Sequence, residues 1–289
     1  MGFIFIEKLQ KKYLLLLVPF FIYGLWIIII YLYGVNIPIL DQWIEPGEQI
    51  ESLFERHFKS SLLYKQYNES RTVIPNIIFL LLANILKEWN VKVEMLIGLT
   101  FTFVMLAIIY LLTTIKKSYF SQNICLLIVY NLLLLSPSSF SRWLRGITLH
   151  RLIPDTCLII NSLIFSLNIN YKIKLLLYSI FCTIAQYSFS GGIVTWIVSL
   201  LFIFYSNISL VKKAKSLTLY IILFLISNYF YFRNYAYPSY HPYVNKIVDF
   251  SLKDVIVYSF AFLGNLFGSS YESSAVIGFI LVAYFTTLT

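Results

Sequence analysis

Asp41 is the first residue of this chain whose type and position could do chemistry. It follows a long apolar run and lies within the segment Ile39–Trp43. An ionisable side chain beside a membrane-type segment is costly to keep there and often has a function. Asp41 could act as a general base toward a hydroxyl group or as an oxygen ligand of a divalent cation. The remaining interpretation is a cap or turn residue at the end of a helix.

A second polar group, Asn68-Glu69-Ser70-Arg71, ends the stretch that follows Asp41. Glu69 and Arg71 could pair with each other in a solvated loop. Alternatively, they place a carboxylate and a guanidinium at the mouth of a cavity, where the guanidinium would suit a phosphate group.

A third group is dense in arginine. Arg142, Arg145 and Arg151 lie within ten residues, next to Trp143 and His150. The planar guanidinium group binds phosphate oxygens in pairs, which favours a site for the phosphate or pyrophosphate of a lipid-linked sugar. The alternative is anchoring to anionic lipid headgroups, although basic anchors are usually placed on the cytoplasmic side of a membrane.

The elements that position these groups must suit a very apolar chain. Of its 289 residues, 59% are hydrophobic and 12% are charged, whereas soluble domains have about 45–50% and about 25%. This composition excludes a soluble enzyme, a disordered chain and a nucleic-acid-binding module. The net charge of +9 comes from lysines beside apolar runs, which is a membrane pattern. The three cysteines lie inside apolar runs, as small buried hydrophobic residues do.

Nine apolar runs predict an all-α, polytopic membrane protein with about nine transmembrane helices, forming a single transmembrane domain over residues 1–289. A membrane-spanning helix needs about 20 mostly apolar residues, so the shorter runs must extend into their polar neighbours. Lysines precede the first run and no cleavage site follows it, which predicts a retained span with a cytoplasmic N-terminus. The runs are Tyr13–Tyr33, Met95–Ile115, Ile124–Leu135, Leu152–Leu167, Leu175–Ser188, Ile193–Tyr205, Leu217–Phe232, Val255–Phe267 and Ala275–Leu288.

A further apolar run, Ile74–Leu86, is too short to assign by length alone. Short cytoplasmic loops collect lysine and arginine. If Ile74–Leu86 does not cross the membrane, the lysine-rich loops near residues 116, 172 and 212 all become cytoplasmic. The outer loops 34–94, 136–151 and 233–254 then hold all six arginines of the chain. We therefore predict that Ile74–Leu86 lies at the outer interface.

The first outer loop is predicted to contain two amphipathic helices lying on the membrane. The first begins at Glu45–Glu48, with proline in its first turn and acidic residues near its N-terminus. Its apolar residues recur every three or four positions, as on one helix face; they are Ile50, Leu53, Phe54, Phe58 and Leu62. The second is the helix over Ile74–Leu86.

The first outer loop resembles that of bacterial membrane glycosyltransferases of the C-type (GT-C) fold. In that group the first span leads to a Pro-x-x-Asp-x-Trp segment and then to Asn-Glu-x-Arg-x-x-x-Pro. The matching residues here are Pro38, Asp41, Trp43, Asn68, Glu69, Arg71 and Pro75. The segments Arg145–Leu149 and Ser188–Trp196 look like later landmarks of the group. The resemblance covers most of residues 1–200 and is strongest over 35–76.

This resemblance implies an enzyme of the bacterial inner (plasma) membrane that transfers a sugar on the outer face. The donor would be a polyprenyl-phosphate-linked sugar, and the acceptor a glycan, a lipid or a protein. Asp41 matches a carboxylate that serves as catalytic base or as ligand of Mg²⁺ or Mn²⁺, and Glu69 is the second catalytic candidate. The residues expected to bind substrate are Trp43, Asn68, Arg71, Arg142, Arg145, His150 and Arg151.

The chain departs from that group at two places. Members commonly have histidine where this chain has Ser70, so any role of that histidine is unfilled. Members are also often longer than this chain, which ends at Thr289 near an apolar run. The expectation is either a short variant or a missing C-terminal part.

Two other classes of function stay open. A transporter or flippase of lipid-linked glycans would use the same arginine-rich face, but it would also need polar residues within its spans, and these are nearly free of charge. A non-catalytic membrane assembly subunit would tolerate the loss of Asp41. No Gly-x-Gly-x-x-Gly segment or P-loop indicates a nucleotide site.

Overall fold

The computed structural model describes residues 20–115, 130–131, 134–135, 143–238, 251–265 and 270–287. Within these residues every regular element is a helix, apart from an isolated bridge between Tyr67 and Ser70. The all-α prediction is therefore confirmed for the described part of the chain. The chain forms two compact units, Met1–Ala236 and Tyr237–Thr289, a division that the sequence did not predict.

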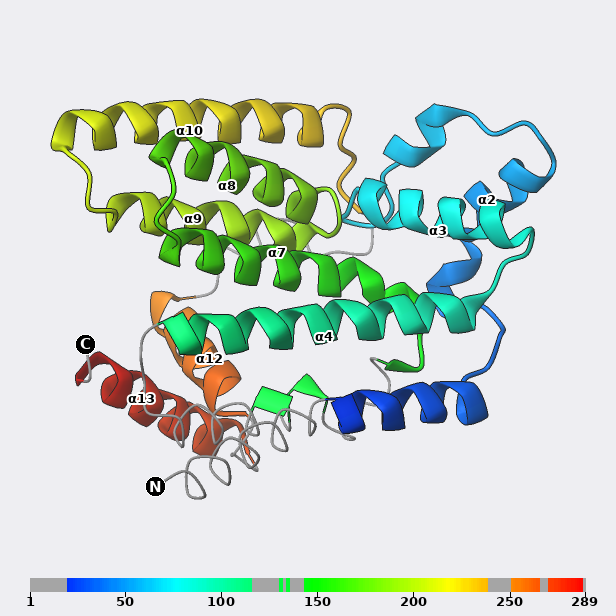
Figure 1. The fold of residues 1–289 in the computed structure, drawn as a ribbon, viewed down its shortest axis with the longest axis horizontal. Helices are drawn as coiled ribbons and strands as arrows, with labels where there is room; N and C mark the ends of the chain where they lie inside the picture. Colours follow the sequence, from blue (N-terminus) through cyan, green and yellow to red (C-terminus); the bar gives the residue numbers. More distant parts are fainter. Residues whose placement is uncertain are drawn as a thin grey trace, which may run out of the picture. The chain divides into compact units, whose positions relative to one another are not determined.

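The helices of the first unit follow the predicted apolar runs closely (Figure 1). An N-terminal helix over Phe20–Tyr33 precedes η1 (Leu40–Trp43), α2 (Gly47–Phe54), η2 (Ser60–Tyr64), α3 (Val73–Leu86), α4 (Val91–Ile115), η4 (Gly146–Thr148), α7 (Leu149–Ser166), α8 (Tyr171–Gln186), η5 (Ser190–Ile193), α9 (Val194–Phe204) and α10 (Leu210–Phe232). The predicted run Ile124–Leu135 lies mostly outside the described residues.

Two described helices, Val91–Leu112 and Gly146–Ser166, are long and apolar enough to cross a membrane. Shorter apolar helices cover Phe20–Tyr33, Val73–Leu86, Ser190–Phe204 and Tyr271–Ala283. These helices indicate association with a membrane. The described residues do not show nine crossings.

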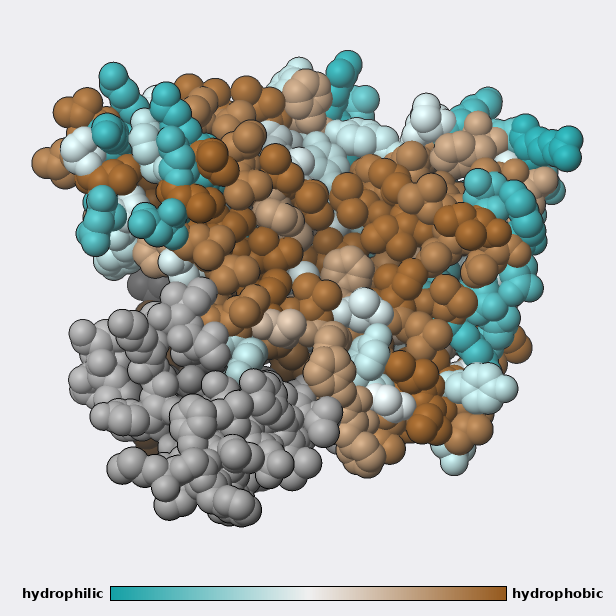
Figure 2. Space-filling view, in the orientation of Figure 1, coloured by the Kyte–Doolittle hydropathy of each residue, from teal (hydrophilic) through white to brown (hydrophobic). Residues whose placement is uncertain are grey.

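The surface of the first unit is apolar between two polar ends. In Figure 2, brown covers the middle of the helices and teal gathers at the two ends of the unit. Large apolar side chains such as Leu176, Ile197 and Leu225 point outward from α8, α9 and α10 and are exposed. Because soluble proteins rarely expose contiguous apolar patches larger than a few hundred Å², we interpret this surface as facing lipid.

The helices also sort the charged side chains between those two ends. α7 leads away from Arg151, α8 returns, α9 leads away again, and α10 returns to Arg233. Lys172 and Lys212 lie in the first turns of α8 and α10, at the opposite end. The described arginines of the first unit therefore lie at one end of the fold, and the lysines that begin α8 and α10 lie at the other.

The interior of the unit is built from large apolar side chains and a few buried polar ones. Trp26 of the N-terminal helix packs against Trp143, with ring centroids 5.9 Å apart, and donates its indole N–H to the carbonyl of Leu135 (3.0 Å). Between α7 and α9, the Asn161 side chain donates to the Ser199 hydroxyl (2.9 Å). These hydrogen bonds satisfy polar groups that would be costly to bury alone.

The first amphipathic helix is shorter than predicted. α2 ends at Phe54 because Arg56 adopts a left-handed backbone conformation (φ 62°) that turns the chain. Phe58 therefore lies beyond the helix, although it still packs with Ile50 against the same core cluster. The apolar residues that recur at three- and four-residue steps therefore pack into one core cluster, but they do not belong to one continuous helix.

The predicted helix over Ile74–Leu86 is confirmed as α3. Both of its ends return to the same short segment of the first loop. Glu45 accepts hydrogen bonds from Thr72 and Asn76 at the start of α3, and Gly47 packs against the ring of Trp89 just after its end. The chain thus leaves and re-enters the same end of the unit.

The second unit consists of α12 (Leu252–Gly264) and α13 (Tyr271–Thr287). The two helices approach closely at glycines: a Cβ atom on Gly278 would lie 1.9 Å from the Phe260 carbonyl oxygen, and one on Gly264 would lie 1.9 Å from the Ser274 carbonyl oxygen. Small residues at a helix contact are typical of helix pairs in membranes. Ser251 and Asp254 form a capping box that starts α12.

Candidate functional site

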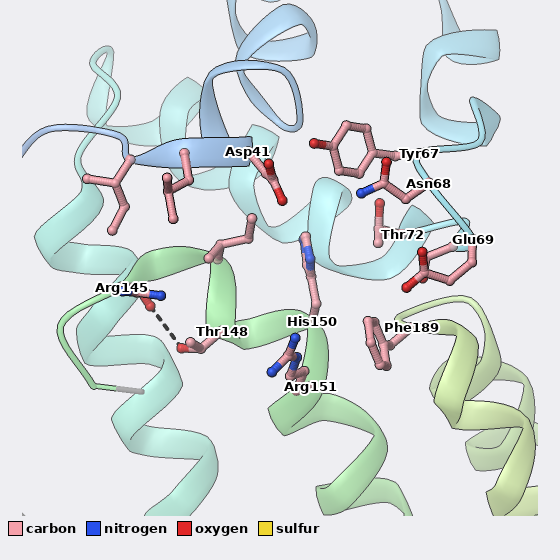
Figure 3. A pocket seen from close by; sticks show the side chains of 14 residues that line it. Asp41, Tyr67, Asn68, Glu69, Thr72, Arg145, Thr148, His150, Arg151 and Phe189 are labelled. Atoms are coloured by element: carbon pink, nitrogen blue, oxygen red, sulfur yellow. Dashed lines mark hydrogen bonds between the residues drawn. The ribbon is translucent and has the colours of Figure 1, made fainter. Parts of the chain in front are cut away.

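A pocket of about 240 Å³ lies where the first outer loop meets the start of α7 (Figure 3). It gathers side chains from four separate segments of the chain. Its polar and aromatic lining residues are Asp41, Tyr67, Asn68, Glu69, Ser70, Thr72, Arg145, Thr148, His150, Arg151 and Phe189. Most of the residues predicted to act on a substrate therefore meet in one place.

Asp41 is held at the pocket by an unusual backbone path. Ile39 is extended and Leu40 has a left-handed conformation (φ 51°), which is uncommon for a residue other than glycine and costs of order 1–3 kcal/mol. The following turn buries the side chain of Gln42 completely and leaves Asp41 exposed. In Figure 3 the Asp41 carboxylate points into the pocket.

The turn that carries Asp41 is anchored by a buried carboxylate on α4. Glu94, only 2% exposed, accepts hydrogen bonds from the Gln42 amide (3.0 Å) and from the Trp89 indole (2.8 Å). Gly146 packs directly against it, because a Cβ atom there would lie 2.0 Å from Glu94 Oε2. Glu94 therefore holds two segments in place. It bonds to Gln42 in the turn that carries Asp41, and it packs against Gly146, the residue that follows Arg145.

Neither Glu94 nor Gln42 was predicted from the sequence to belong to the site. The available signal was an acidic residue in the first turn of the long apolar helix α4. A carboxylate in such a segment needs partners, and Gln42 and Trp89 supply them.

Arg145 and Arg151 form the basic side of the pocket. Arg145 has an extended conformation (φ −141°), and its carbonyl accepts a hydrogen bond from the Thr148 hydroxyl (2.8 Å). Arg151 lies over the ring of Phe189, 5.5 Å from its centroid. Neither guanidinium pairs with a carboxylate among the described residues. Both charges are therefore available to an anionic ligand.

His150 contributes a buried ring to the pocket wall. The side chain is 8% exposed and meets the Phe79 ring edge-on, with centroids 5.8 Å apart. Its Nε2 atom has no hydrogen-bond partner in the part of the chain that the structure describes. Because buried polar atoms are normally bonded, this nitrogen is a candidate contact for a ligand.

Behind the pocket wall lies a second buried carboxylate, Glu45. The Thr72 hydroxyl, which lines the pocket, donates to it, as does the Asn76 amide (2.5 Å). Burial raises the pKa of Glu45 above its ordinary value, and these hydrogen bonds lower it in part. The cluster fixes Thr72 and the start of α3 against the first loop.

Arg71 and Trp43 do not line this pocket, although both were expected to bind substrate. The Arg71 side chain is 4% exposed and donates to the carbonyls of Tyr64, Tyr231 and Arg233. Trp43 is exposed and contacts the ring of Trp89 at 5.9 Å. Arg142 lies outside the described residues.

Ser70, where the resemblance leads us to expect a histidine, bonds to the backbone of a later segment. Its hydroxyl accepts a hydrogen bond from the backbone N–H of Ser190 (3.1 Å). This bond ties the polar group of the first loop to the start of η5 and so brings Phe189 to the pocket.

The acidic side of the pocket suits a cation held together with a phosphate ligand. Asp41 and Glu69 both line it, and Mg²⁺ is commonly held by one or two carboxylates plus substrate phosphates. No group of three or more histidine, cysteine or acidic residues forms a metal site among the described residues. A bound Mg²⁺ or Mn²⁺ stays a prediction.

No family model, curated protein or solved structure matches this chain. The resemblance to membrane glycosyltransferases therefore stays a prediction from the sequence motifs, and the function must be argued from the pocket itself. That pocket places two carboxylates and two guanidiniums, which form no ion pair among the described residues, around one volume. This arrangement suits a substrate with both a phosphate and a reacting hydroxyl group.

Proposed function

We propose that this chain is a membrane glycosyltransferase that moves a sugar from a polyprenyl-phosphate-linked donor to an acceptor hydroxyl on the outer face of the membrane. The observation that supports this most is the pocket in which Asp41 faces Arg145 and Arg151 (Figure 3). The extensive apolar surface beside it gives a polyprenyl chain an environment that matches its chemistry.

The reaction needs one proton acceptor and one phosphate site. Asp41 takes the proton from the acceptor hydroxyl, and the acceptor oxygen forms a bond to the anomeric carbon of the donor sugar. The bond from that carbon to the phosphate oxygen breaks, and its electron pair leaves with the polyprenyl phosphate. Arg145 and Arg151 stabilise the negative charge that develops on the departing phosphate. Glu69 orients the acceptor or shares a cation with Asp41.

The same proposal includes about nine spans in the bacterial inner membrane, a cytoplasmic N-terminus, and an α3 that does not cross. Two features support this topology. Both ends of α3 return to the segment around Glu45 and Gly47, and the described arginines of the first unit lie at the end opposite the lysines that begin α8 and α10. Lysine-rich loops typically face the cytoplasm.

Cysteine labelling tests this topology. In a chain without its native cysteines, single cysteines at Ser60 and Glu88 should react with a membrane-impermeant maleimide added to intact cells. Cysteines at Asn168 and Lys212 should react only after the cells are opened. All four positions are exposed, so a lack of labelling reports sidedness and not burial. Protection at Glu88 together with labelling at Asn168 would contradict the proposed orientation.

Replacing Arg145 or Arg151 by alanine is expected to weaken binding of undecaprenyl phosphate by about 10- to 100-fold each, since a hydrogen bond to a charged group contributes about 1.5–3 kcal/mol. Binding can be measured by titrating purified protein in nanodiscs. Arg56→Ala is the matched control, because Arg56 is an exposed arginine of the first outer loop and does not line the pocket. Equal affinity in all three variants would remove the phosphate site from the proposal.

The competing proposal of a transporter or flippase needs a polar path through the bundle. Gln186 and Asn228 do bond to each other inside the unit (3.2 Å), but no aspartate, glutamate, lysine or arginine of α7, α8, α9 or α10 is buried. Ion-coupled transporters commonly carry such residues within their spans. The buried carboxylate of α4, Glu94, is held by Gln42 and Trp89 in the first turn of that helix. Enzymatic transfer is therefore the function that we favour.

A further inference from the structure

A second cavity, of about 320 Å³, lies between the first outer loop and the C-terminal end of α10. Its lining residues are Tyr64, Gln66, Arg71, Arg233 and Asn234. None of them lines the first pocket, and all belong to the first unit. The short segment Asn68–Arg71 separates the two sites, since Asn68 and Glu69 line the first pocket and Arg71 lines the second.

Arg71 brings a buried positive charge to this cavity. Its Nε atom donates to the Tyr231 carbonyl (2.6 Å), Nη1 to the Tyr64 carbonyl (2.5 Å) and Nη2 to the Arg233 carbonyl (2.6 Å). A guanidinium has five N–H donors, so two remain after these three bonds. The group also lies over the Tyr64 ring, 4.3 Å from its centroid.

The charge of Arg71 is not neutralised by an ion pair within the described residues. Main-chain carbonyls satisfy its donors but carry no net charge. Burying an unpaired charge is costly, and a second guanidinium, that of Arg233, lines the same cavity. Two arginines that share a cavity and form no ion pair within the part of the chain that the structure describes favour an anion as its occupant.

The remaining residues hold the rim of the cavity in place. Gln66 donates to the carbonyls of Asn68 (2.7 Å) and Ala236 (2.6 Å) and accepts from the backbone N–H of Ala236 (2.9 Å). Asn234 has a left-handed conformation (φ 55°), which turns the chain directly after Arg233. Arg233 is thus presented by a fixed turn, and its side chain is exposed.

We propose that this cavity is a second oxyanion site, which binds a phosphate or carboxylate group separately from the donor phosphate in the first pocket. The proposal of an oxyanion site depends only on Arg71 and Arg233 and not on the proposed function. Its use by an acidic acceptor substrate rests on the proposed function. An anionic lipid headgroup offers the same chemistry and is distinguished by the experiment.

The test is a titration of the full chain with inorganic phosphate, in nanodiscs of zwitterionic lipid. Two binding sites are expected. Arg233→Ala should remove one of them, or weaken it about tenfold or more, and the double variant Arg145→Ala/Arg151→Ala should remove the other. Arg56→Ala should keep both. Nanodiscs that contain phosphatidylglycerol distinguish a lipid headgroup from a soluble anion as the natural occupant. A headgroup in the cavity would block phosphate binding at the Arg233 site only.

Unchanged phosphate binding in Arg233→Ala would overturn the second site. Loss of a site in Arg233→Ala, with no loss in the Arg145/Arg151 double variant, would keep the second oxyanion site and contradict the phosphate role of the first pocket. The two proposals therefore fail by different results. Arg233→Lys provides a further readout, since a point charge should retain part of the affinity that a planar guanidinium supplies.

Discussion

Replacing Asp41 by asparagine is expected to lower the rate of sugar transfer by a factor of about 10² to 10⁴, the usual contribution of a general base. Asparagine keeps the shape of the side chain but cannot take the proton of the acceptor hydroxyl. The fold should not suffer, because Asp41 is exposed and only its main-chain carbonyl enters the turn, accepting from the N–H groups of Ile44 and Glu45. The measurement is transfer of radiolabelled sugar from a polyprenyl-phosphate donor in isolated membranes.

Glu51→Gln is the matched control for Asp41→Asn, since Glu51 is an exposed acid of the same loop outside the pocket. A normal transfer rate in Asp41→Asn, with normal accumulation in the membrane, would exclude Asp41 as the base and favour the non-catalytic subunit. Chelation of divalent cations separates the two roles of Asp41. A base keeps its activity without a cation, whereas a ligand of Mg²⁺ or Mn²⁺ does not.

The second large effect is expected for Gly146→Ala. The new Cβ atom would lie 2.0 Å from Glu94 Oε2, 2.8 Å from Glu94 Cβ and 3.0 Å from Gln42 Nε2. Both neighbours are buried and held by each other, so they have little room to move. Overpacking and a broken buried hydrogen bond together should cost about 2–4 kcal/mol of unfolding free energy. Thermal unfolding of the purified protein in detergent measures this loss.

Transfer activity should fall with stability in Gly146→Ala, because displacing Glu94 moves the turn of Asp41 and the residue Arg145 at the same time. Gly24→Ala is the control, since no atom lies within 4 Å of a Cβ at that position. Alanine in the middle of a helix should be neutral or stabilising by up to about 1 kcal/mol. Equal unfolding temperatures for the two variants would show that Glu94 does not bind Gly146 as closely as described.

The sequence predicted the helices well because apolar runs are a local signal. Runs such as Met95–Ile115 and Leu217–Phe232 lie within α4 and α10 and end at the same residues, since an apolar segment satisfies its own backbone by forming a helix. The charge pattern also predicted that distant loops share one end of the molecule. That is why Asp41 and Arg151 could be expected in one site although they are far apart in the sequence.

The sequence could not predict which polar side chains form hydrogen bonds that hold the fold together and which remain available to a ligand. Arg71 and Arg145 look alike in sequence, yet Arg71 is enclosed by carbonyls and Arg145 is left without an ion pair among the described residues. Gln42 and Glu94 form a buried pair across residues that no local pattern connects. Whether a polar residue binds substrate or supports the backbone depends on tertiary contacts, which hydrophobic periodicity does not report.

The three carbonyl groups that accept hydrogen bonds from Arg71 also determine when, during synthesis of the chain, its side chain can be buried. Two of its three partners, Tyr231 and Arg233, come about 160 residues after it, so a ribosome must produce α3, α4, α7, α8, α9 and α10 before these contacts can form. Until α10 has formed, the Arg71 guanidinium lacks two of its three carbonyl partners. Chains that stop before α10 therefore leave this guanidinium without the contacts that bury it in the finished protein.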